Sequence, residues 1–172
     1  FRKLYCNGHL PFEVDGSAHY YHIKKLAWKT NIQLINITVL LPICIEGIID
    51  HNKKYRDVAE IAIKEICEHA DISDVANSFK HVIEPFKLIF RHGMKVNIIQ
   101  ALASVRTLLT AIKQNRMVIE HFYCELFLPL NVYMNEKINM TGEIFYGEWN
   151  DKFLSEEIFE TLRYIETLGV DR

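Results

Sequence analysis

The chain has 172 residues, of which 49% are hydrophobic and 24% are charged, and its formal net charge at pH 7 is −2. This length and composition are typical of one globular domain with a sizeable core, and they exclude disordered and collagen-like chains. The nearly neutral charge argues against a general nucleic-acid-binding protein, which is usually basic. The sequence does not begin with Met, so we expect further residues before Phe1.

Residues 1–30 carry many large aromatic side chains and no helical repeat pattern. The aromatic residues are Phe1, Tyr5, Phe12, Tyr20, Tyr21 and Trp28. Large aromatic side chains tend to be buried, so we expect this segment to be an N-terminal arm that packs on the rest of the domain. Leu10 to Val14 is compatible with a short extended piece.

The most apolar run, from Ile32 to Ile49, is interrupted by polar and helix-bending residues such as Gln33, Pro42 and Glu46. A helix that spans a lipid bilayer tolerates these residues poorly. We therefore expect a buried helix and no membrane segment.

Three prolines lie in similar apolar surroundings at a nearly constant interval. Pro42, Pro85 and Pro129 are separated by 43 and 44 residues. This interval matches the roughly 40–47 residues of HEAT and armadillo units, each of which is a set of packed helices. The spacing predicts three equivalent helices that each contain a proline.

The segment that follows each proline has the pattern of an amphipathic helix. The first runs from a polar turn at 51–54 to His69, the second follows Gly93 and ends near Lys113, and the third begins near Asp151 and stops at Gly169. We expect Gly93 to end a helix in the left-handed conformation. The fold prediction is all-α: a HEAT/armadillo-like array of about three helix pairs over residues 31–172, with the arm over 1–30.

Charge is distributed unevenly over this predicted array. The turns inside the helix pairs are expected to share one edge, and they are basic, whereas the connection between the first two pairs is acidic (Glu65, Glu68, Asp71 and Asp74). The basic residues, which are candidates for binding an acidic partner, are Lys53, Lys54, Arg56, Arg91, His92, Lys95 and Lys137. The alternative interpretation is that these turns are simply soluble.

An insertion at residues 135–150 interrupts the repeat and carries Phe145, Tyr146 and Trp149. These aromatic residues either pack on the last helix pair or form an exposed anchor for a partner, because Tyr and Trp are common anchors at interfaces.

No catalytic or cofactor-binding motif stands out in the sequence. There is no glycine-rich phosphate loop, no nucleophile elbow, no zinc-protease motif and no calcium-binding loop. His19 and His22 lack a second ligand pair at a spacing that would suit zinc. We predict no enzyme activity, no metal and no cofactor.

The order of these features resembles the parkin co-regulated gene product family. The similarity lies in the aromatic arm, in Gly8-His9-Leu10-Pro11 and Leu26-Ala27-Trp28, and in the three proline helices at Leu41-Pro42, Ile83–Ile89 and Phe127–Leu130. The chain departs from the family at Leu34-Ile35-Asn36 and at Cys44–Gly47. It therefore resembles a divergent member.

The resemblance implies a non-enzymatic structural protein of the ciliary or flagellar axoneme. It implies binding to tubulin at the inner junction of doublet microtubules, where such a protein bridges the A- and B-tubules beside another junction protein. It implies neither a nucleic-acid nor a membrane partner. The alternative is a general helical-repeat adaptor that binds a peptide or small protein without contacting tubulin.

Overall fold

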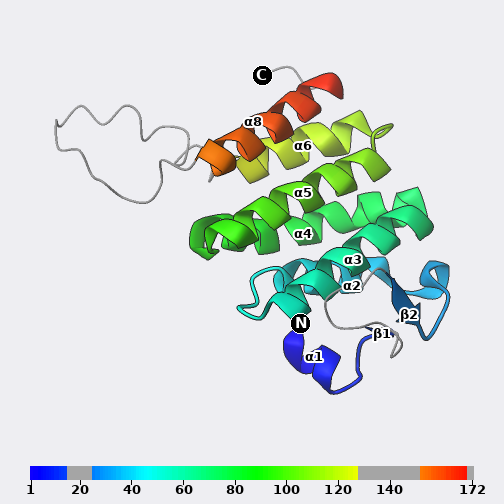
Figure 1. The fold of residues 1–172 in the computed structure, drawn as a ribbon. Coiled ribbons are helices and arrows are strands. Elements are labelled where there is room, and N and C mark those ends of the chain that lie inside the picture. The colour runs from blue at the N-terminus through cyan, green and yellow to red at the C-terminus, as the bar shows by residue number, and fades with distance from the viewer. Residues whose placement is uncertain (15–24, 128–151, 170–172) are drawn as a thin grey trace.

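The computed structural model describes residues 1–14, 25–127 and 152–169 (Figure 1). Helices account for most of these residues, and the one sheet that they form is small and lies near the N-terminus. The elements in chain order are α1 (Arg2–Cys6), β1 (Phe12–Val14), β2 (Leu26–Trp28), the 3-10 helix η1 (Ile32–Leu34), α2 (Ile37–Gly47), α3 (Lys53–His69), α4 (Ile72–His92), α5 (Lys95–Ala111), α6 (Arg116–Phe127) and α8 (Lys152–Thr167).

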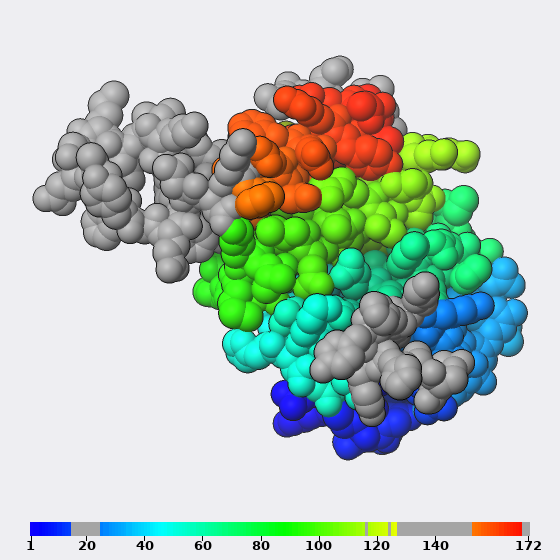
Figure 2. Space-filling view, viewed as in Figure 1, coloured from blue at the N-terminus to red at the C-terminus, as the bar shows by residue number. Residues whose placement is uncertain are grey.

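The long helices stack in two layers. Helix α2 packs on α4 and α4 packs on α6, while α3 packs on α5 and α5 packs on α8. Figure 1 shows that successive helices run in opposite directions, so the α2–α3 and α4–α5 turns lie along the left edge of the view. The space-filling view in Figure 2 shows the same order, with α1 at one end and α8 at the other.

Two of the three prolines occupy equivalent places in this stack. Pro42 lies inside α2 and Pro85 lies inside α4, and these two helices pack directly against each other. Each proline precedes the next long helix by a similar distance, because α3 begins at Lys53 and α5 begins at Lys95. Pro129 lies outside the described residues.

The predicted amphipathic helices are confirmed at α3, α5 and α8. In α8, for example, the stripe of Leu154, Ile158, Leu162 and Ile165 is buried. Helix α5 is buried more widely than its stripe predicts, because it packs on α3, α4 and α8. Polar residues such as Asn97 and Ser104 are therefore inside as well.

Gly93 and Gly169, which follow α4 and α8, end these two helices differently. Gly169 has a positive φ of 82°, the left-handed conformation that glycine adopts most easily. The prediction of the same conformation at Gly93 is wrong, because its φ of −72° and ψ of 149° are extended. Gly93 is required for space instead, since a Cβ atom there would lie 2.5 Å from the carbonyl oxygen of Ile89.

The N-terminal segment adds a small sheet, so the fold is not purely helical. Strands β1 and β2 pair antiparallel, with Phe12 opposite Trp28, and the two rings meet edge to face at 4.9 Å between centroids. Leu10, Phe12 and Leu26 are buried and belong to the same core as the helices. Tyr20 and Tyr21 lie outside the described residues.

None of the helices in the described part of the chain combines the length and apolar character that a membrane span requires.

Candidate functional site

The turns inside the first two helix pairs bring five basic residues to one edge of the stack (Figure 1). Lys53 and Lys54 begin α3, Arg91 and His92 end α4, and Lys95 begins α5. All are exposed except Lys54, which is half-buried. We call these five residues the basic edge.

The first turn of the basic edge is partly neutralised by its own helix. The Nζ atom of Lys53 lies 2.5 Å from Oδ2 of Asp57, one turn along α3. The Lys53 side chain nevertheless remains 77% exposed. An ion pair this exposed is held weakly, so a stronger anionic partner can compete with Asp57 for the ammonium group.

Arg56 was grouped with these surface residues by its position in the sequence, but the structure places it inside. Only 8% of the residue is exposed. Its guanidinium donates to the carbonyl oxygens of Asp50 and His51, each at 2.9 Å, and to the amide oxygen of Gln100 at 3.2 Å. Arg56 therefore holds the α2–α3 turn against α5 and does not contribute to the exposed basic edge.

Asn97, which the sequence analysis did not single out, connects the two turns. It is fully buried near the start of α5. Its side-chain amide donates to the carbonyl oxygen of Ile48 at 2.5 Å, and its amide oxygen accepts from the backbone N–H of Met94 at 2.9 Å. A single side chain thus joins the α4–α5 turn to the end of α2 in the preceding helix pair.

The structure does not describe four of the predicted partner-binding residues. Lys137, which was assigned to the basic edge, and the aromatic residues Phe145, Tyr146 and Trp149 lie outside the described residues.

The connection between the first two pairs, at the opposite edge, is acidic as predicted, with one exception. Glu68 and Asp71 are exposed, and Glu68 lies 3.9 Å from Lys64. Glu65 is 7% exposed and is not a surface charge. Its carboxylate accepts from the backbone N–H of Leu26 at 3.0 Å and from the indole N–H of Trp28, which attaches the arm to α3.

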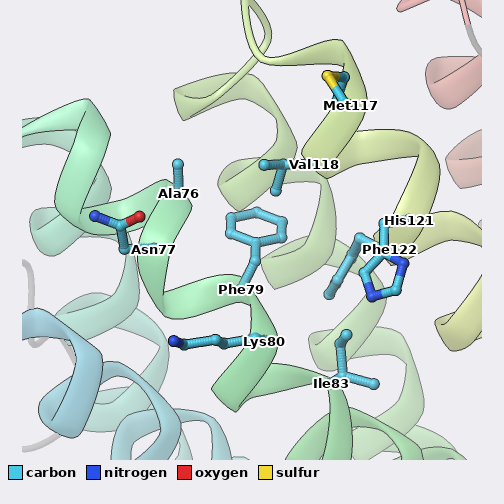
Figure 3. Close-up of a pocket in the computed structure, with 9 residues that line it drawn as sticks. All are labelled: Ala76, Asn77, Phe79, Lys80, Ile83, Met117, Val118, His121 and Phe122. Atoms are coloured by element: carbon cyan, nitrogen blue, oxygen red, sulfur yellow. The ribbon is translucent and has the colours of Figure 1, made fainter.

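A second surface feature lies between α4 and α6 (Figure 3). This groove has a volume of about 290 Å³. Figure 3 shows the rings of Phe79 and Phe122 between the two helices, with Val118 next to Phe79 and Met117 further away at the top of the view. The residues that line the groove are Ala76, Asn77, Phe79, Lys80, Ile83, Met117, Val118, His121 and Phe122.

Two observations on the described residues concern metal binding and thiol chemistry. These residues contain no group of three or more His, Cys, Asp or Glu side chains that could hold a metal ion. Burial raises the pKa of the Cys67 thiol to about 12 and also raises the pKa of Cys44. Both thiols are therefore protonated at neutral pH and are poor nucleophiles.

Residues 1–171 match the family model described as Parkin co-regulated protein. The chain is also similar to the mouse protein named Parkin coregulated gene protein homolog. The two are 24% identical over 173 residues, which cover 98% of this chain and 68% of the mouse protein. The match spans the arm and all of the described helices.

Proposed function

Because the chain belongs to the Parkin co-regulated protein family, we propose that it is a non-enzymatic structural protein that binds microtubules in cilia and flagella. In this proposal it contacts tubulin at the inner junction of axonemal doublets and helps to bridge the A- and B-tubules beside a neighbouring junction protein. The stacked helix pairs are, in the same proposal, a HEAT/armadillo-like array.

The observation that carries the tubulin part of the proposal is the basic edge. Two successive turns present Lys53, Lys54, Arg91, His92 and Lys95 on one side of a chain whose net charge is −2. The outer surface of tubulin is acidic. An edge of one charge steers an oppositely charged surface during encounter and favours contacts at the rim of the interface.

The internal hydrogen bonds support a structural role. Arg56 connects the first turn to Gln100 on α5, and Asn97 connects the second turn to Ile48. Each pair in a helical stack contacts its neighbours, so bonds between pairs stiffen the whole array. A bridge between two tubules has to hold a constant spacing, and a stiff array does so.

The second candidate function is that of an adaptor that binds a peptide or small protein without contacting tubulin. The groove between α4 and α6 is the observation that favours it. In this case the basic edge is only a soluble surface.

Co-sedimentation with microtubules at two salt concentrations distinguishes the tubulin-binding protein from the adaptor. We expect the wild-type protein to pellet and to pellet less as salt rises, because a Debye length of about 10 Å at 0.1 M screens exposed charges. Changing Lys54→Glu together with Arg91→Glu reverses two charges of the basic edge, and we expect it to weaken binding by about tenfold. The melting temperature should change little, since Arg91 is exposed and Lys54 is only half-buried.

The matched control is Lys64→Glu with Lys113→Glu, which makes the same change in net charge away from the basic edge. We expect this control to pellet like the wild type. If both double variants lose binding equally, net charge and not the basic edge is responsible. If the wild-type protein does not pellet at either salt concentration, the tubulin proposal is wrong and the adaptor is favoured.

A further inference from the structure

The groove between α4 and α6 continues as an apolar row along α4. Ile72, Ala76, Phe79 and Ile83 are spaced by four, three and four residues, so they lie on one face of that helix. With a rise of 1.5 Å per residue, the row is about 16 Å long. This length corresponds to three turns of a second helix laid against it.

The groove has a buried floor and an exposed apolar rim. Phe79 and Phe122 are almost fully buried, and their rings meet edge to face at 4.8 Å between centroids. Met117, which lines the groove, is 82% exposed, and Ile72, one turn before Ala76 on α4, is 56% exposed. Methionine is common at surfaces that adapt to a bound helix, because its side chain is flexible and polarisable.

Among the described residues that line the groove, the ionisable ones are Lys80 and His121, and none is a carboxylate. The carboxylates of Glu84 and Glu125 on the same two helices are engaged by Lys87, whose Nζ atom lies 3.2 Å and 2.6 Å from them. The Glu125 contact raises the pKa of Lys87 and lowers the pKa of Glu125, so this pair stays charged at neutral pH. A ligand in the groove therefore faces a cation beside the apolar row.

We propose that this groove binds an amphipathic helix of a partner protein, with large apolar side chains at every third or fourth position and with carboxylates beside them. The apolar side chains lie along the row from Ile72 to Ile83, one of them fills the cavity beside Met117, and a carboxylate pairs with Lys80. This is the recognition mode in which a helix lies in a groove between two other helices. The inference does not depend on tubulin binding.

A displayed peptide library tests the proposal on the full chain. The peptides are about 16 residues long, to exceed the length of the row, with Leu, Ile, Phe or Met at helical spacing and a random choice of Glu, Lys, Gln or Ala elsewhere. We expect selection to enrich Glu over Lys. Ala76→Arg, which places a long side chain in the groove, should weaken the enriched peptides by about tenfold or more. Lys80→Glu should shift the selection toward Lys.

The control is Val39→Arg, which adds the same side chain at an exposed apolar residue on α2, outside the groove. It should leave peptide binding unchanged, and circular dichroism should give equal melting temperatures for Ala76→Arg and Val39→Arg. The proposal is overturned if the enriched peptides are basic, or if they bind the Ala76→Arg and Val39→Arg variants equally. It is also overturned if sedimentation velocity finds a dimer that Ala76→Arg dissociates, because the occupant is then a second copy of this chain.

Discussion

The two ends of the helical stack are completed in different ways. At the N-terminal end, β1 and β2 cover the first pair with buried apolar side chains and are attached through the buried carboxylate of Glu65. At the C-terminal end, α8 packs on α5 with its own buried apolar stripe, and polar bonds add to this contact. The guanidinium of Arg106 lies 2.7 Å from the carboxylate of Glu157 and 2.8 Å from the hydroxyl of Thr161.

This difference shows two solutions to one problem. The terminal repeat of a stack has no neighbour on its outer side, so that side must be covered or polar. The N-terminal end is covered by a separate part of the chain, which depends on one buried charge. At the C-terminal end, α8 is amphipathic: its apolar stripe is buried, and Ser155, Glu160 and Arg163 on its other side are exposed.

The largest effect is expected at the N-terminal end. Glu65→Ala removes the acceptor of two hydrogen bonds and leaves the donors of Leu26 and Trp28 without it. We expect a loss of about 2–3 kcal/mol in the free energy of unfolding, because bonds to a charged acceptor are strong and their loss is costly. Thermal unfolding followed by Trp28 fluorescence, in a Trp149→Phe background, measures it.

Glu65→Gln keeps one acceptor and is the matched control, so its effect should be intermediate. If Glu65→Ala melts like the wild type, the carboxylate does not hold the arm.

A smaller effect is expected at the C-terminal end. Arg106→Met keeps much of the side-chain volume but removes the bonds to Glu157 and Thr161. Both charged side chains are partly exposed, so we expect a loss of about 1–2 kcal/mol. Hydrogen exchange of the backbone amides should accelerate in α8 more than in α2.

The control is Arg163→Met, at an exposed arginine on α8, which should change the free energy of unfolding by no more than about 0.5 kcal/mol. Equal acceleration throughout the chain would contradict this local role of Arg106.

The smallest effect concerns the ion pair between α4 and α6. The hydrogen bond from Lys87 lowers the pKa of Glu125, so the carboxylate stabilises the fold above its unfolded pKa and this contribution is lost as pH falls through the lowered value. The same bond raises the pKa of Lys87, so the contribution of the ammonium is lost as pH rises through that raised value. Glu125→Gln should therefore lower the melting temperature at neutral pH and have no effect in acid.

Glu84→Gln, which removes the more exposed partner of Lys87, is the control for Glu125→Gln. It should lower the melting temperature less. A melting-temperature difference for Glu125→Gln that is the same at neutral and acid pH would exclude the ion pair as its cause.

The sequence predicts the helices well because periodic apolar residues report directly which face of a helix is buried. The bounds of α3 follow from that pattern, whereas the apolar run from Ile32 to Ile49, predicted as one buried helix, is divided into η1 and α2. Arg56 and Glu65 were taken as surface charges because each has a partner that is distant in the sequence. Gln100 lies 44 residues after Arg56, and Leu26 lies 39 residues before Glu65. A pattern within one helix contains no information on such partners.

The candidate site is predictable in part for the same reason. The alternation of turns places Lys53, Lys54, Arg91, His92 and Lys95 on one edge, as expected. The groove was not predicted, because it forms only where Phe79 and Phe122, which are far apart in the sequence, meet between α4 and α6. For Gly93, the residue type indicates a helix end but does not distinguish a need for left-handed backbone from a need for space.

The bond from Asn97 to Ile48 has a consequence for any large ligand of the basic edge. It prevents the α4–α5 turn from sliding along the end of α2, so the two clusters of cations keep one separation. A ligand that touches both clusters loses little conformational entropy on the protein side, because the cations are preorganised. A polymer that repeats its acidic groups at that period can engage both clusters together, whereas one with another period can engage only one at a time.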